Sequence, residues 1–258
     1  DWDFWLGTAP ARHYNDGIYH PAKWRGWYDF GGGSLADFCC HGFQLAYRAL
    51  DLGAPIRIEA TGEDLGHESY ATRCNLTFTF AAKGDRGPVK LFFYSGDKNL
   101  PPNEITQGPV GSTGCLIVGS NGTLCAGLWN TDCNVRLKGA TKFRGADKPE
   151  VASIHKTQPR IDTEVLKWDP RRAAKGQRPR WSRVNNSHMF EWALACKGDT
   201  QSYSPFEIGA QITEIGMLGL LALRLQKPID WDAAGRKAVG LPEADALINP
   251  SRRTEYLR

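Results

Sequence analysis

The sequence contains few signals for a metal or a nucleotide site. Neither of its close cysteine pairs, Cys39-Cys40 and Cys125 with Cys133, has the C-x2-C spacing that is typical of zinc sites. No G-x-G-x-x-G or G-x-x-x-x-G-K-[ST] motif follows a predicted strand. We therefore expect no metal and no dinucleotide to be bound by this chain alone, and we interpret the seven cysteines mostly as free thiols.

Charge and hydropathy argue against two further classes of partner. The net charge is only +4 over 258 residues, so the field of the whole molecule gives no reason to expect nucleic acid. No apolar run approaches the roughly 20 residues that a membrane span needs, and an ordinary soluble globular protein is expected. The first residues show no targeting segment, which leaves both a cytoplasmic and an exported, periplasmic location open.

A single core is expected for a chain of this length, so residues 1–258 are interpreted as one domain. Residues 1–33 are rich in aromatic side chains but have no helical or strand period, which predicts a loop region that either packs on the core or lines a pocket. Residues 145–184 combine many basic residues with several prolines, which predicts a basic surface excursion. Residues 229–258 are polar and are expected to lie over the surface as a C-terminal tail.

Helices are predicted on both sides of a run of strands. Apolar residues recur at helical spacing over 35–52, with Ser34 as N-cap and Gly53 just past the end. Two more helices are predicted over 187–197 and 205–225. The last of them is apolar on more than one face, as expected of a helix buried against a sheet.

The β-type runs between these helices are 56–60, 71–82, 89–94, 115–118 and 124–128. The first two long strands are expected to pair as a hairpin. A second hairpin is predicted around Asn121-Gly122, because this dipeptide supplies the positive φ angles of a tight turn. Helices that flank consecutive hairpins indicate an α+β fold and argue against an alternating βαβ series.

Asp37 and His41 have a spacing that suits acid-base chemistry. They are four residues apart near the start of a predicted helix, so both side chains lie on one face, one turn apart. The helix dipole favours a carboxylate at that end, and an imidazole can accept or donate a proton near neutral pH. Such pairs are also frequent by chance, so spacing alone leaves a structural role open.

Several longer motifs resemble the Gfo/Idh/MocA oxidoreductases, particularly a bacterial branch of that family. They are Trp2-Asp3-Phe4-Trp5-Leu6-Gly7, Trp24-Arg25-Gly26-Trp27-Tyr28-Asp29-Phe30-Gly31-Gly32-Gly33 and Asp37-Phe38-Cys39-Cys40-His41. Segments 84–91, 188–198 and the Glu214 helix followed by Ile229-Asp230-Trp231-Asp232 are similar to later parts of the same branch. The motifs cover nearly the whole chain, and the order and spacing of several of them make the resemblance specific.

The resemblance implies a two-domain enzyme in which an N-terminal Rossmann domain, absent from this chain, binds NAD or NADP. The chain itself would be the C-terminal domain, with a large open, mainly antiparallel (mixed) β-sheet and helices packed on one face. That open sheet implies a homo-oligomer. The resemblance also implies that Asp37 and His41 lie beside the substrate, next to a lysine of an E-K-P motif that has no counterpart here.

The implied activity is hydride transfer between the nicotinamide and a sugar, polyol or related carbohydrate. His41 would accept the hydroxyl proton, and Asp37 would orient the imidazole or bind a substrate hydroxyl. Trp24, Arg25 and Trp27 are candidates for lining the substrate pocket, with core packing and a surface salt bridge as the alternative.

His188 is a further substrate-binding candidate at the start of a helix, where its His-x-x-Glu spacing also fits a structural role. Two other functions remain open for the chain as a whole. One is an NAD-dependent glycosidase that acts by transient oxidation and elimination. The other is a cofactor-free carbohydrate-binding or oligomerisation module, which the missing lysine and missing glycine-rich turn favour.

Overall fold

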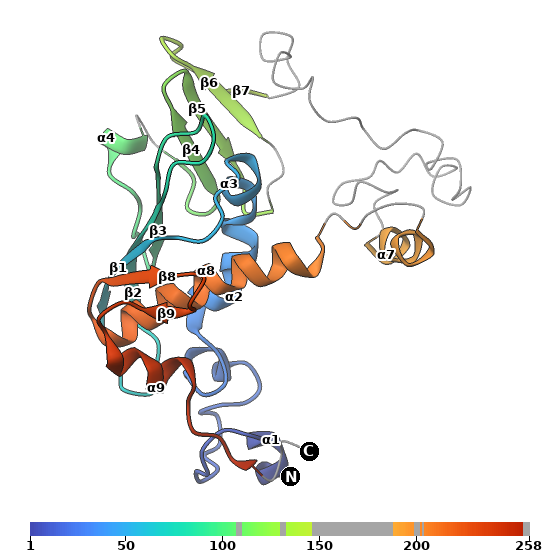
Figure 1. Cartoon of the computed structure of the whole chain (residues 1–258), viewed down its shortest axis with the longest axis vertical. Helices are drawn as coiled ribbons and strands as arrows, with labels where there is room; N and C mark the ends of the chain where they lie inside the picture. Colours follow the sequence, from blue (N-terminus) through green and yellow to red (C-terminus); the bar gives the residue numbers. More distant parts are fainter. Residues whose placement is uncertain (107–109, 130–132, 146–187, 199–201, 203, 255–258) are drawn as a thin grey trace. The chain divides into compact units, whose positions relative to one another are not determined.

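The computed structural model describes residues 1–106, 110–129, 133–145, 188–198, 202 and 204–254 (Figure 1). The chain divides into two compact units, where the sequence analysis expected one core. The first comprises Asp1–Ser112 with Ala210–Arg258, and the second comprises Thr113–Gly209. The predicted basic excursion at 145–184 lies outside the described residues except for Gly145.

The first unit contains a five-stranded antiparallel sheet with the order β3-β2-β1-β8-β9 (Figure 1). Its strands are β1 Arg57–Glu63, β2 Arg73–Phe80, β3 Val89–Ser95, β8 Ile229–Asp232 and β9 Lys237–Ala238. β1 pairs with β2 from Arg57 opposite Thr79 to Glu63 opposite Arg73. β3 pairs with the other side of β2, so the predicted antiparallel pairing of these strands is confirmed.

The start of the predicted surface tail is part of this sheet, and the prediction is wrong there. β8 pairs with β1, where Ile229 lies opposite Ile58, and both side chains are fully buried. Because the strand is only four residues long, its apolar residues are too few to give a period in the sequence. After β9 the chain forms the 3-10 helix η3 (Pro242–Ala244) and the short helix α9 (Asp245–Ile248).

The segments predicted as one loop (1–33) and one helix (35–52) each contain two short helices. The predicted loop region contains α1 (Trp2–Leu6), whose N-cap Asp1 accepts a hydrogen bond from the Phe4 amide, and η1 (Lys23–Gly26). The helix predicted over 35–52 is two helices, α2 (Gly33–Gly42) and α3 (Gln44–Ala49), which are separated at Phe43. The remaining short helix of this unit is α4 (Asn103–Thr106).

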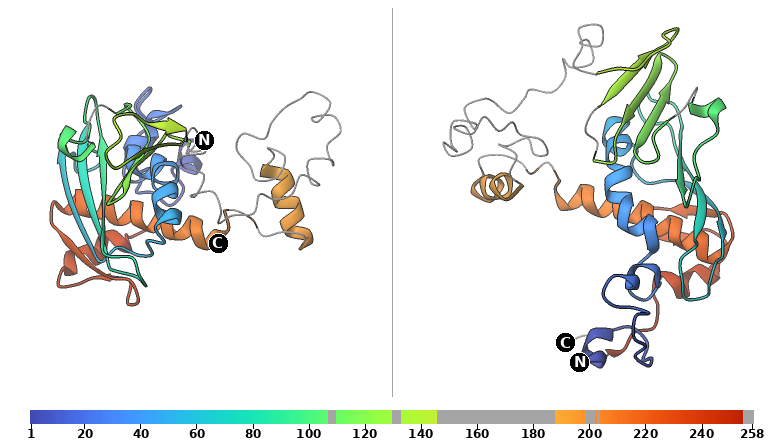
Figure 2. Two further views of the ribbon diagram at one scale, coloured as in Figure 1. Left: turned by 90° about the horizontal axis from the view of Figure 1, so that it is seen from above. Right: turned by 180° about the vertical axis from the view of Figure 1, so that it is seen from behind.

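The core of the first unit lies between one face of the sheet and the helices α2 and α8 (Phe206–Leu225), which Figure 2 shows on the same side of the sheet. Every second residue of β2 is buried, namely Cys74, Leu76, Phe78 and Phe80. Leu35 of α2 and Gly219 of α8 lie close together over Leu76 and Phe78. The apolar composition of α8 on several faces is thus explained by burial against the sheet.

α8 is also long and apolar enough to cross a membrane by length and composition, with a mean hydropathy of 1.4. The sequence analysis did not anticipate a run of this length. The core helix of a globular domain meets the same criteria, and eight residues of α8 are buried. The burial of these residues therefore accounts for the apolar composition of α8.

The second unit contains a four-stranded antiparallel sheet in the order β4-β5-β6-β7. Its strands are β4 Cys115–Gly119, β5 Gly122–Ala126, β6 Asn134–Leu137 and β7 Arg144–Gly145, and its described helix is α7 His188–Lys197. The predicted hairpin is confirmed, but Gly119 faces Gly122, so the turn residues are Ser120 and Asn121. Only Gly122 has a positive φ angle there. The described part of the chain therefore confirms the predicted α+β class, with two antiparallel sheets where one large sheet was expected.

The three glycines that precede α2 each lie against a different neighbour. A Cβ on Gly31 would be 2.7 Å from the Arg25 carbonyl oxygen, and one on Gly32 would be 2.9 Å from Leu220 Cδ2. Gly33 has a φ angle of 60°, and a Cβ there would overlap the ring of Tyr70. The run is thus required for close packing at the start of α2, because any side chain would displace a neighbour.

We expect Gly33→Ala to lower the stability of the first unit strongly. The left-handed backbone costs about 1–2 kcal/mol for a residue with a Cβ, and the overlap with Tyr70 adds about 1–3 kcal/mol of overpacking. Gly17→Ala is the matched control, because Gly17 has a φ angle of 69° but no atom within 4 Å of its Cβ position. Urea unfolding of both variants measures the difference, and equal losses would contradict the close packing of Tyr70 on Gly33.

We expect Gly219→Ala to destabilise the protein, although alanine favours a helix by about 1 kcal/mol. The new Cβ would be 2.7 Å from Leu76 Cδ2 and 2.8 Å from Phe78 Cζ, and both side chains are fully buried. Overpacking of this kind costs about 1–3 kcal/mol. In the same helix, Gly209→Ala has open space and should be neutral or stabilising in the same urea titration. Stabilisation by Gly219→Ala would show that the helix lies farther from the sheet.

Candidate functional site

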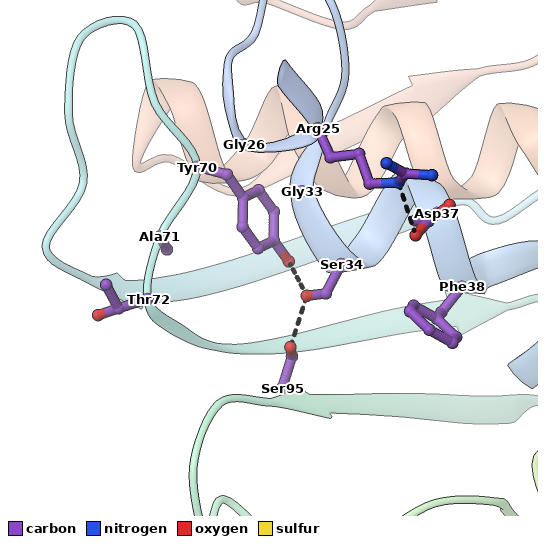
Figure 3. A pocket seen from close by; sticks show the side chains of 10 residues that line it. All are labelled: Arg25, Gly26, Gly33, Ser34, Asp37, Phe38, Tyr70, Ala71, Thr72 and Ser95. Atoms are coloured by element: carbon purple, nitrogen blue, oxygen red, sulfur yellow. Dashed lines mark hydrogen bonds and ion pairs between the residues drawn. The ribbon is translucent and has the colours of Figure 1, made fainter. Parts of the chain in front are cut away.

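An open pocket of about 460 Å³ lies in the first unit, where α2 and η1 meet the ends of β2 and β3 (Figure 3). Its lining residues are Arg25, Gly26, Gly33, Ser34, Asp37, Phe38, Tyr70, Ala71, Thr72 and Ser95. The η1 segment is held here by backbone pairing, because the Tyr70 amide donates to the Gly26 carbonyl at 2.8 Å and the Tyr28 amide donates to Glu68 at 2.9 Å. These bonds place Arg25 at the rim of the pocket.

Two predicted site residues, Arg25 and Asp37, face each other in this pocket. Arg25 Nε lies 3.5 Å from Asp37 Oδ2, and both side chains are 48% exposed. The guanidinium group also lies over the Trp24 ring at 4.6 Å, which adds a cation-π contact. An exposed pair of this kind contributes little to stability, so its main effect is on the charge of the pocket.

A chain of hydroxyl groups lines the other side of the pocket. Ser34 Oγ is 2.6 Å from Ser95 Oγ and donates to the Tyr70 hydroxyl at 3.4 Å, as Figure 3 shows. The Tyr70 hydroxyl is in turn 3.0 Å from Cys74 Sγ. Burial raises the pKa of the Tyr70 phenol, and Cys74 raises that pKa further, so Tyr70 stays protonated and can donate a hydrogen bond.

The sequence analysis did not identify these hydroxyl residues as part of the site. Ser34 was interpreted as the N-cap of the helix, whereas the N-cap is Gly32 and Ser34 lies inside the first turn of α2. Tyr70, Thr72 and Ser95 come from segments far away in the sequence and carry no local pattern. Only the pairing of β2 with β3, with Cys74 opposite Ser95, brings them to one place.

His41 lies on α2 one turn after Asp37, as the spacing predicts. Its ring makes an edge contact with Phe38, with centroids 6.0 Å apart, and it is partly exposed. Asp37 and Phe38 line the pocket, but His41 is not among the lining residues. The helix therefore presents the carboxylate to the pocket directly and holds the imidazole beside Phe38.

Trp24 and Trp27 differ in their surroundings. Trp24 supports Arg25 at the rim, but it does not line the pocket itself. Trp27 packs against the buried Tyr19 with centroids 5.0 Å apart. Tyr19 also contacts Trp2 and Trp5, so the rings of residues 1–33 largely pack on one another. For Trp27 the structure supports the alternative of core packing.

His188 is the first residue of α7 in the second unit, and its side chain is exposed. It does not line the pocket described above. Its substrate-binding role stays a prediction without support from a described contact.

The cysteines and acidic residues give no metal site in the described part of the chain, where no group of three or more His, Cys, Asp or Glu side chains could hold an ion. None of the seven cysteines forms a disulfide in this structure. Burial raises the pKa of the Cys39 thiol to about 11, which makes it unreactive at neutral pH.

The described residues do not fit a bound NAD or NADP. The one glycine-rich run, Gly31-Gly32-Gly33, is packed against Arg25, Leu220 and Tyr70 and leaves no open cradle for a phosphate. It also follows η1 and a loop, whereas the phosphate-binding turn of a Rossmann domain follows a strand. The glycine run of the described residues is therefore not a dinucleotide site.

Comparison with known proteins gives one match. Residues 1–106 match a family model described as the oxidoreductase family, C-terminal alpha/beta domain, of the Gfo/Idh/MocA group. No curated protein matches the chain. The later motifs at 188–198 and 229–232 lie beyond the matched residues, so their resemblance stays a prediction. All ten residues that line the pocket lie in the segment that matches the C-terminal alpha/beta domain of the Gfo/Idh/MocA oxidoreductases.

Proposed function

We propose that this chain is the substrate domain of an NAD(P)-dependent oxidoreductase that acts on a sugar, a polyol or a related carbohydrate. The observation that carries the proposal is the pocket, in which Asp37 and Arg25 face a chain of three hydroxyl groups. A few converging polar groups in a concave site of this size are typical of small-molecule binding. The family match supports the reaction class.

The residues of this chain bind the substrate and accept a proton from it. Ser34, Tyr70 and Ser95 hydrogen-bond to substrate hydroxyls, and Asp37 accepts a hydrogen bond from the hydroxyl that is oxidised. His41, whose ring centroid lies 6.0 Å from that of the lining residue Phe38, takes the proton of that hydroxyl as general base. The cofactor, and the lysine that this sequence lacks, come from a dinucleotide-binding domain outside these residues.

We expect Asp37→Asn and His41→Gln to lower kcat of the complete gene product about 10²–10⁴-fold, because His41→Gln removes the general base and Asp37→Asn removes the carboxylate that orients the reacting hydroxyl. The measurement is the absorbance of reduced nicotinamide during turnover of a panel of sugars and polyols with NAD or NADP. His67→Gln is the control, since His67 is an exposed loop residue of the same unit. Full activity of both site variants would exclude the assigned roles.

The same assay separates the dehydrogenase from the glycosidase. A dehydrogenase accumulates reduced cofactor, whereas a glycosidase that oxidises and reduces its substrate in one cycle releases product without net absorbance change. Substrate binding without any turnover by the gene product would favour the cofactor-free binding module.

We further propose a homo-oligomer through the face of the five-stranded sheet opposite α2 and α8. On this face Thr77 alternates with the buried Leu76 and Phe78, and its cross-strand partner Phe92 is 43% exposed. An exposed aromatic ring on a polar sheet face is a suitable centre for an interface.

We expect Phe92→Arg to reduce the molar mass of the gene product in light scattering, because a buried guanidinium without a partner disfavours the interface. Phe4→Arg serves as the control, because Phe4 is 76% exposed on α1, away from the strands of the sheet. A monomeric wild type, or an unchanged mass of the Phe92 variant, would refute this interface.

A further inference from the structure

The hydroxyl chain of the pocket ends at the edge of the five-stranded sheet. Ser95, whose Oγ lies 2.6 Å from Ser34 Oγ, is the last residue of β3 (Figure 3). β3 is the outer strand of the described sheet, and the pair of Cys74 with Ser95 closes its ladder with β2. The end of an edge strand frays readily, because it has a neighbouring strand on one side only. A further contact is therefore required to give Ser95 a fixed position.

The buried side chain of Asn99, in the loop after β3, supplies this contact. Asn99 is 6% exposed, and its Nδ2 donates to the Ser95 carbonyl at 2.9 Å and to the Cys74 carbonyl at 3.0 Å. The same nitrogen donates to Asn75 Oδ1 at 2.8 Å, and Asn99 Oδ1 accepts from Arg73 Nη2 at 3.2 Å. One amide thus joins the end of β3 to successive residues of β2.

The loop between Ser95 and Asn99 turns back onto β2. Gly96 and Lys98 both have positive φ angles, of 117° and 51°, and the Asn99 amide donates to the Gly96 carbonyl at 3.2 Å. A Cβ on Gly96 would be 2.8 Å from Arg73 Cγ, so the loop lies directly against the strand. This close approach brings the Asn99 side chain within reach of both strands.

Asn99 is not among the lining residues, so its effect on a ligand passes through the residues it holds. One of them, Ser95, carries a hydroxyl of the chain. The other, Cys74, lies at the far end of the same chain, because its Sγ is 3.0 Å from the Tyr70 hydroxyl. The amide therefore fixes the Ser95 hydroxyl relative to β2 and to Tyr70.

We propose that Asn99 is a positioning residue, which holds the Ser95 hydroxyl where it meets the substrate. The inference rests on the proposed function, because it takes the pocket as the substrate site. It assigns a role in that site to a residue outside the pocket lining.

The test is a double-mutant cycle on the complete gene product, with turnover of glucose, galactose and myo-inositol by NAD or NADP as the readout. For the probe with the highest kcat/KM, Ser95→Ala should raise KM about fivefold at nearly constant kcat, because the lost hydrogen bond is present in the ground state and the transition state. Asn99→Ala should raise KM by the same factor. The double variant should show the increase only once, because without the Ser95 hydroxyl Asn99 has no group to position.

Two further variants separate positioning from stability. Asn99→Asp has the size of the wild-type side chain and keeps an oxygen for Arg73, but it loses the N–H donors. It should repeat the rise in KM, and it carries the test if Asn99→Ala does not fold. Trp231→Phe removes the 3.1 Å hydrogen bond from Trp231 Nε1 to Glu214 Oε1, between β8 and α8, and should lower the urea midpoint without a change in KM.

The outcomes separate the inference from the proposed function. Losses that multiply to about 25-fold in the double variant would overturn the inference and leave the proposed function in place. An unchanged KM in the Asn99 variants, or an equal rise in Trp231→Phe, would do the same. An unchanged KM in Ser95→Ala would overturn the inference by removing Ser95 from the substrate site. If the wild type turns over none of the three probes, the proposed function fails and the inference fails with it.

Discussion

The close approach of α2 to the edge of the five-stranded sheet depends on Gly33, whose missing side chain makes room for the ring of Tyr70. With the ring in that place, the Tyr70 hydroxyl reaches Ser34 in the first turn of α2, and Ser34 reaches Ser95 at the end of β3. The helix start is thereby tied to two strands. The pocket exists because this packing holds Asp37 one turn further along, beside the rim.

In the first unit, different residues of this interface stabilise the fold and line the pocket. The deep part of the interface is apolar, with Leu35, Leu76 and Phe78 fully buried around Gly219. Its polar edge carries the exposed pair of Arg25 and Asp37, which adds little to the free energy of folding. The residues of this edge are therefore free to serve binding, because the apolar part already fixes the geometry of the helix.

The proposed role of this chain as a substrate domain agrees with these features. Among the described residues, the glycine run 31–33 offers no cradle for a dinucleotide, since protein atoms fill the space around it. The described part does have a concave polar site next to a helix that carries a carboxylate and an imidazole. A substrate domain needs such a site, and it needs a second domain for the cofactor.

Local patterns in the sequence were sufficient to predict most of the helices and strands and to indicate the family resemblance. The apolar period over residues 35–52, the turn before β5 and the apolar faces of α8 are all properties of neighbouring residues, and they predicted elements that the structure contains. The sequence did not predict the break between α2 and α3 at Phe43 or the strand β8 at the start of the tail. Each involves only a few residues, and their structure depends on contacts with distant strands.

The composition of the pocket was decided by tertiary structure alone. Ser34, Tyr70 and Ser95 are separated by up to 61 residues, and no local period connects them. Strand pairing brings Ser95 opposite Cys74, and the glycine at position 33 admits the Tyr70 ring. The sequence by itself determined that a carboxylate and an imidazole share one helix face, because residues four apart in a helix lie one turn from each other. Which hydroxyl groups meet that face depended on long-range contacts, because these follow from packing in three dimensions.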